Sequence, residues 1–214
     1  MEHLIKQLTR LFLGVGCSLI LMSVLGACNL FGGVESAPTP TPTPTSKPSV
    51  ASSTVPTGDF LSYRGDGYVI SYPRGWKVDT SKAGFVTFSD PQGIAYLSVH
   101  VQPNPNGVIS AEDQVSVGLQ LFRSQVTHYQ PVSVAPTTTV AGESWNQGAA
   151  TGDLRVEGQP NPVTVKIVVL AANHPANSPQ TQGFTIAYAT AQEIFDLADQ
   201  GEFQPMLRSF AFSS

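Results

Sequence analysis

Threonine alternates with proline in residues 37–49, and this tract limits which parts of the chain can fold together. Large apolar side chains are almost absent between Phe31 and residue 57. Such a stretch cannot bury enough apolar surface to offset the entropy cost of ordering it. We therefore predict a disordered tether over residues 28–57, extended by its Thr-Pro repeats as polyproline II, and one globular domain over residues 58–214.

The first residues have the layout of an export signal. Lys6 and Arg10 precede an uncharged apolar run at residues 11–24. A membrane-spanning helix needs ~20 apolar residues, so this run is short for an anchor and typical of the core of a signal peptide. The prediction is a signal peptide over residues 1–27.

The signal ends in Leu25-Gly26-Ala27-Cys28, which resembles the bacterial lipobox, where small residues precede a cysteine that is acylated before cleavage. The resemblance implies cleavage between Ala27 and Cys28 and a lipid anchor on Cys28. The alternative is an uncleaved transmembrane anchor at residues 11–27, and both readings export the same domain. The implied location is extracytoplasmic, on the outer face of the cytoplasmic membrane or in the cell envelope, where stable anchoring takes more than one acyl chain.

Cysteine usage and charge argue against several classes of function. The other cysteine, Cys17, lies in the predicted signal peptide, so the mature domain would hold no thiol for a disulfide, a metal or a nucleophile. The chain has 11 Lys and Arg against 15 Asp and Glu, and its basic residues are scattered singly. We expect no nucleic-acid partner from that pattern.

Residues 67–78 predict the beginning of a β-sheet. Tyr68, Ile70 and Tyr72 recur with the period of two that places bulky side chains on one face of a strand. Trp76 follows a turn and is expected in the core. Further strands are predicted at residues 84–88, 94–101, 132–140, 144–151, 153–156, 163–170 and 184–189. The valine-rich run at 163–170 suits a central strand that is covered on both faces.

Two helices are predicted. Ser110 and Asp113 form an N-terminal capping pattern before an apolar stripe that extends to residue 126. Thr190 and Glu193 form a second capping pattern, which predicts a helix that extends through residue 200. Gly201 is expected to end this helix. A last helical turn is expected from the spacing of Phe203, Met206, Leu207 and Phe210.

These elements predict an α+β domain, an antiparallel β-sheet covered by helices. Three segments resemble the PsbP/Mog1/DcrB-like superfamily: GYVISYPRGW at residues 67–76, FSDP at 88–91, and the ending with FTIAYAT and PMLRSFAF at 184–212. The resemblance covers most of residues 66–212 and rests on structural motifs. It implies an α/β/α sandwich, an exported bacterial lipoprotein and an accessory binding role, and it brings no catalytic residues.

Few residues are candidates for catalysis. Residues 142–146, centred on Ser144, begin like a nucleophile elbow but lack its final glycine and lie between predicted strands. A composite centre of His100 and Asp90 stays open. The histidines of the mature chain, His100, His128 and His174, have no partner at metal-ligand spacing, so no metal site is expected.

The segment at residues 172–183 is the candidate binding loop, with Asn173, His174 and Asn177 as its polar residues. It leaves the most apolar predicted strand, and functional residues concentrate in loops that a rigid scaffold holds. An ordinary solvated connection is the alternative.

The expected function is that of a non-catalytic domain, without a cofactor, that binds a protein partner or assists an envelope or membrane complex. One alternative is an exported hydrolase that uses Ser144 or a His100/Asp90 centre. Another is a lipoprotein that captures a small solute or a metal in a pocket. The sequence does not indicate an oligomeric state.

Overall fold

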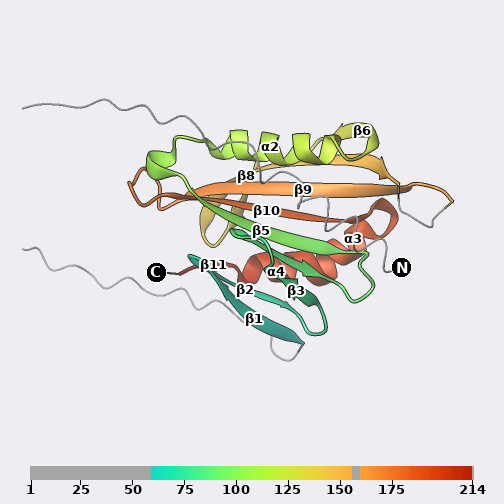
Figure 1. Cartoon of the computed structure of the whole chain (residues 1–214), viewed down its shortest axis with the longest axis horizontal. Helices are drawn as coiled ribbons and strands as arrows, with labels where there is room; N and C mark the ends of the chain where they lie inside the picture. Colours follow the sequence, from blue (N-terminus) through green and yellow to red (C-terminus); the bar gives the residue numbers. More distant parts are fainter. Residues whose placement is uncertain (1–58, 156–159, 214) are drawn as a thin grey trace, which may run out of the picture.

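The computed structural model describes residues 59–155 and 160–213 (Figure 1). The predicted signal peptide, the lipobox with Ala27 and Cys28, and the Thr-Pro tether lie outside the described residues. None of the helices in the described part combines the length and the apolar content needed to cross a membrane.

A large antiparallel sheet of eight strands forms the centre of the domain (Figure 1). Its strand order is β3-β4-β5-β10-β9-β8-β6, and β7 also pairs with β8. Because β9 occupies one side of β8, β6 and β7 follow each other along its outer edge. The strands are β3 (Lys77–Asp79), β4 (Phe85–Ser89), β5 (Tyr96–Pro103), β6 (Thr127–Val132), β7 (Thr137–Val140), β8 (Glu143–Leu154), β9 (Val163–His174) and β10 (Gln182–Ala191).

The valine-rich run forms a central strand, as predicted. β9 lies between β10 and β8. Ile167 and Val169 are buried on one face, and Val168 and Leu170 are buried on the other. The sheet therefore has a separate apolar cluster on each side.

One face of the large sheet carries α2 (Ala111–Arg123) (Figure 1). The predicted N-cap is confirmed, since the Ser110 hydroxyl accepts a hydrogen bond from the Asp113 backbone N–H at 3.0 Å. Val115 and Phe122 of the apolar stripe are buried against the sheet. A short 3-10 turn, η1 (Pro105–Gly107), precedes this helix.

The opposite face differs from the prediction. It is covered by a second, three-stranded sheet and by a C-terminal segment of short helical turns (Figure 1). Aromatic and aliphatic side chains of both pack in one cluster with those of the large sheet. The domain is mostly antiparallel β-sheet, and the expected α/β/α sandwich is wrong. The elements are β1 (Phe60–Gly65), β2 (Tyr68–Pro73), β11 (Ala211–Phe212), η2 (Gln192–Ile194), α3 (Phe195–Ala198), η3 (Asp199–Phe203) and α4 (Gln204–Ser209).

Strand boundaries differ from the predicted ones on the outer side of the large sheet. β8 continues through Gly152, because β9 pairs with it along its whole second half. Of the expected strand at 132–140, Val132 ends β6, which begins earlier at Thr127, and residues 137–140 form β7, while residues 133–136 belong to neither strand. β9 extends to His174, so Asn173 and His174 belong to a strand, and the connection to β10 spans residues 175–181.

The C-terminal helical segment also differs in detail. Thr190 belongs to β10, and no side chain caps the turn that follows. Gly201 does not end a helix, because the π-helical turn η3 carries the chain through it into α4. The predicted apolar turn is confirmed, since Phe203, Met206, Leu207 and Phe210 are all buried.

Candidate functional site

A cleft of about 610 Å³ opens between the β7–β8 hairpin and the C-terminal segment. The hairpin forms one wall, β9 and β10 form the floor, and α4 with β11 forms the other wall. Figure 1 shows the hairpin descending from the large sheet toward β11. The lining residues are Thr138, Thr139, Val140, Ala141, Gly142, Glu143, Gln147, Leu170, His174, Tyr188, Gln204, Leu207, Arg208, Phe210, Ala211 and Phe212. The size suits a small molecule or a short peptide.

His174 and Glu143 form a polar pair in this cleft. The imidazole Nδ1 lies 2.8 Å from the Glu143 Oε1. The ring also stacks on Phe212, with centroids 3.7 Å apart and planes 6° from parallel. Because a carboxylate only accepts, Nδ1 carries a proton, and the tautomer with its single proton on Nδ1 offers Nε2 as an acceptor. Within the described residues Nε2 has no hydrogen-bond partner.

Arg208 supplies a cation to the opposite wall. It lies in the last turn of α4 and is exposed. No carboxylate in the described part of the chain forms an ion pair with it. A guanidinium presents a planar fork of donors that matches a carboxylate, so this position can hold an anionic group of a ligand.

Trp145 supports the aromatic wall from behind. Its side chain is fully buried, stacked on Phe212 at 6.1 Å and edge-on to Phe210 at 5.4 Å. These contacts hold β11 against β8 and fix the ring on which His174 stacks. The cleft is therefore bounded on this side by a rigid aromatic cluster.

The three residues of the candidate binding loop separate in space. His174 lines the cleft. Asn173 faces the α2 side, where its Oδ1 accepts hydrogen bonds from Asn104 Nδ2 at 2.9 Å and Gln114 Nε2 at 2.8 Å. This network fastens the β5–α2 connection to β9, which is a structural role. Asn177 is exposed in the turn before β10, with a positive φ of 53°.

Ser144 lies in β8, opposite Thr139 of the hairpin. Neighbouring residues of a strand point to opposite faces, so Ser144 faces away from the side on which Glu143 holds His174. It is exposed and does not line the cleft. The structure does not bring this hydroxyl to an imidazole.

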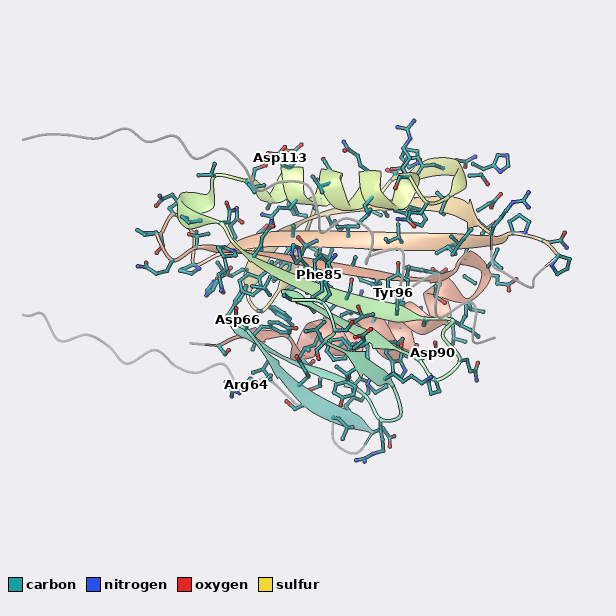
Figure 2. All side chains as sticks on the ribbon, viewed as in Figure 1. Arg64, Asp66, Phe85, Asp90, Tyr96 and Asp113 are labelled. Atoms are coloured by element: carbon teal, nitrogen blue, oxygen red, sulfur yellow. The ribbon has the colours of Figure 1, made fainter. Side chains whose placement is uncertain are left out.

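His100 and Asp90 lie at opposite ends of the β4–β5 hairpin. His100 stacks on Phe85 with ring centroids 3.8 Å apart, and Figure 2 shows Phe85 well separated from Asp90. Burial, with a smaller contribution from Lys82, lowers the pKa of His100 to about 4. Asp90 closes its turn, where Oδ1 accepts the Ala95 N–H at 2.9 Å. The two residues form no common centre.

His128 is exposed on β6, with Nδ1 2.9 Å from Asp153 Oδ2. Hydrogen bonds from Thr164 and His128 lower the pKa of Asp153. This pair lies outside the cleft. Across residues 59–155 and 160–213, no three His, Cys, Asp or Glu side chains gather as metal ligands would.

Glu143, Arg208 and Phe212 are cleft residues that sequence reasoning missed. Glu143 and His174 are 31 positions apart and no local motif links them. Arg208 stands within the predicted apolar turn as an ordinary solvated charge. The cleft could be predicted only from the strand order of the sheet, which places β8 next to β9.

Comparisons with known proteins identify no relatives by sequence. No protein-family model matches the chain, and no curated protein matches it either.

Among solved structures, the chain is similar to a Bacteroides thetaiotaomicron VPI-5482 protein at 8% identity and a TM-score of 0.43, covering 73% of this chain. It spans 49% of that protein, about half of its length. It is also similar to LpqN, which is involved in cell envelope biogenesis of Mycobacterium tuberculosis, at 12% identity and a TM-score of 0.41, with 72% of this chain and 91% of that one covered. A Pseudomonas aeruginosa protein of unknown function, PA94, matches at 15% identity and a TM-score of 0.33, over 67% and 90% of the two chains. Likenesses this weak assign neither a family nor a function, so the resemblance to the PsbP/Mog1/DcrB-like superfamily stays a prediction.

Proposed function

We propose that the protein is an exported lipoprotein, anchored through Cys28, whose PsbP-like domain binds a partner protein of the envelope or membrane without chemical change. The cleft between the β7–β8 hairpin and the α4–β11 wall is the proposed binding site. Its open volume, aromatic wall and cation at Arg208 are the observation that carries the proposal. The export and anchoring parts depend on the lipobox of the sequence.

The surroundings of His174 support binding rather than catalysis. Hydrolysis through a covalent enzyme intermediate needs a nucleophile within hydrogen-bond distance of its general base, and the base needs a group that orients it. Glu143 is such an orienting group, but no hydroxyl among the described residues is hydrogen-bonded to His174. Ser144, the nucleophile suggested by the sequence, faces the other way.

A hydrolase that activates water directly is the second candidate. The observation that favours it is the 2.8 Å contact between Glu143 and His174, since a carboxylate that holds Nδ1 leaves Nε2 able to take a proton from water. This candidate predicts turnover of an ester or amide that His174→Gln abolishes. The binding proposal predicts that no such turnover is found.

Site-specific photocrosslinking in native membranes tests the proposal. A photoreactive p-benzoyl-phenylalanine replaces Thr138, which lines the cleft and lies opposite Trp145 on the face of β8 that carries Glu143, and in a matched variant it replaces Val117, which is 60% exposed on α2 at the other face. The proposal expects a discrete adduct from position 138 that is absent from position 117. Equal labelling from both positions, or none from position 138, would overturn it.

A further inference from the structure

The outer edge of β7 is an unpaired strand edge beside the cleft. β7 pairs with β8 on one side, and in the described part of the chain no strand pairs with its other side. Thr138, Thr139 and Val140 of this strand line the cleft. The edge and the cleft therefore belong to one surface.

The hairpin turn determines which backbone groups that edge presents. Ala141 and Gly142 have positive φ values of 53° and 78°, as in a two-residue type I′ turn. In such a turn the flanking residues, Val140 and Glu143, form the hydrogen-bonded pair. Pairs alternate along an antiparallel ladder, so the N–H and C=O groups of Thr137 and Thr139 point away from β8. Both residues are exposed.

Apart from its shortness, this edge carries no protection against pairing with another chain. Proteins commonly guard edge strands with charged residues, prolines or bulges. β7 reads Thr-Thr-Thr-Val, and its pairing with β8 is regular over all four residues. Its shortness limits an added strand to a short segment.

The wall opposite β7 supplies side-chain recognition. Leu207 and Phe210 line the cleft, and Arg208 is an exposed cation that forms no salt bridge among the described residues, although its charge lowers the pKa of Asp199. Glu143, the acid of the cleft, is already hydrogen-bonded to His174. The guanidinium of Arg208 is therefore the group that an acidic ligand would pair with.

We infer that the cleft binds an extended peptide segment of the partner protein, which adds a strand to the free edge of β7 and places a carboxylate on Arg208. Strand addition draws affinity from main-chain hydrogen bonds and specificity from alternate side chains. The apolar floor receives every second side chain of the segment, and the carboxylate comes from an acidic side chain or from the end of the chain. This inference rests on the proposed function, since it names the ligand of the same cleft.

The test uses the full mature chain in detergent and a displayed library of random heptapeptides with free carboxyl ends. Peptides enriched by the wild type are synthesised, and their affinities are measured by fluorescence anisotropy. Thr139→Pro removes the outward N–H and is tolerated at an edge, whereas Thr139→Val keeps that N–H and the branched shape. The inference expects a loss of affinity of about tenfold or more for Thr139→Pro and a change within about twofold for Thr139→Val, since several main-chain hydrogen bonds depend on the added strand.

The carboxylate is tested by a double-mutant cycle. Arg208→Gln is expected to weaken binding about fivefold or more, and the matched Arg123→Gln on α2 is expected to leave it unchanged. Two peptide variants identify which carboxylate binds Arg208: one has an amidated end, and the other has its acidic residue changed to the amide. The variant that lacks the carboxylate in question should bind the wild type more weakly, but should bind Arg208→Gln as well as the unmodified peptide does. The inference is overturned if the wild type enriches no peptides or if Thr139→Pro binds the peptides as tightly as the wild type. It is also overturned if Arg123→Gln loses as much affinity as Arg208→Gln.

Failure of this inference is distinguishable from failure of the proposed function. If the crosslink from position 138 persists while the peptide affinities are the same for Thr139→Pro and the wild type, the cleft binds a different class of ligand and only the strand-addition inference fails. If Thr139→Pro changes the oligomeric state instead of peptide affinity, the edge pairs with a second copy of the chain, which also overturns it. Loss of the specific crosslink overturns both.

Discussion

His174 and Glu143 are 31 positions apart and meet because β8 and β9 are neighbours in the sheet. Their contact, and the stack of His174 on Phe212, fix an imidazole in the cleft. Both partners of this contact are partly exposed, at 32% and 41% of their side-chain surface. A contact this exposed contributes little to the stability of the fold, and the proposal gives it the role of orienting a ligand group.

Changing adjacent residues of β8 separates the cleft face from the other face. Glu143→Ala removes the group that orients His174, and we expect the crosslink yield from position 138 to fall about threefold or more, the size of a lost orienting hydrogen bond. Ser144→Ala is the matched control, because this hydroxyl lies on the opposite face, and it should leave the yield unchanged. Quantitative immunoblotting of the adduct measures both. A loss with Ser144→Ala and none with Glu143→Ala would contradict this placement.

His100 is expected to make the stability of the domain depend on pH. Its pKa is lowered from 6.5 to about 4, mainly by burial, so the unfolded chain takes up the proton first as the pH falls. The free energy of unfolding should decrease between pH 6.5 and 4, by on the order of 1–3 kcal/mol from this residue. His100→Phe keeps a ring to stack on Phe85 and should lack this decrease. Urea unfolding at each pH measures the difference.

Comparing wild type with His100→Phe removes the contribution of other titrating groups to the pH dependence of the free energy of unfolding. Burial raises the pKa of Asp199 and Glu202, and hydrogen bonds from Thr164 and His128 lower that of Asp153. These carboxyl groups titrate in both proteins, so their effect cancels in the difference. Parallel pH profiles for wild type and His100→Phe would contradict the assignment to this residue.

At the scale of elements, α2 lies close to the sheet because β8 carries a glycine beneath it. A Cβ added at Gly148 would lie 2.8 Å from Leu119 and 2.9 Å from Val115. Gly148→Ala should therefore lower the free energy of unfolding by about 1–3 kcal/mol, the usual cost of overpacking. Gly201→Ala, where nothing lies within 4 Å, should be neutral or stabilising by up to ~1 kcal/mol. Denaturant unfolding of both variants tests this, and equal effects would contradict it.

Residue patterns within one segment predicted the elements that depend mainly on interactions within that segment. The period of two predicted β2, the Asp90 turn predicted the β4–β5 hairpin, and the Ser110 cap with its apolar stripe predicted α2. The Thr190 cap failed because strand pairing with β9 keeps that residue in β10. Pairing with a distant strand overrides a local capping pattern.

The cleft depended on contacts that no local pattern contains. The sequence pattern predicts His174 in a loop, yet β9 extends to it because Gln182 of β10 pairs with it. Arg208 and Phe212 reach the same place only after the C-terminal segment has packed across the large sheet. The residue types of the candidate site were visible in the sequence, but their grouping was not.

At the scale of the whole molecule, the proposed lipid anchor on Cys28 holds the binding domain at the membrane. Cys28→Ser removes the thiol that would be acylated, so the protein should be released from the membrane or retained with its signal peptide. Membrane fractionation with mass spectrometry of the amino terminus measures this. A Cys28→Ser protein that partitions into the membrane at mature size would contradict acylation as the anchor.

Amide hydrogen exchange compares the protein in its native membrane with the purified chain and tests the central claim most directly. If a partner segment occupies the cleft, exchange should slow in β7 and α4 in the membrane sample, while α2 on the opposite face keeps its rate. Slowing confined to α2, or identical rates in β7 in both samples, would show that the cleft is not where this protein meets its partner.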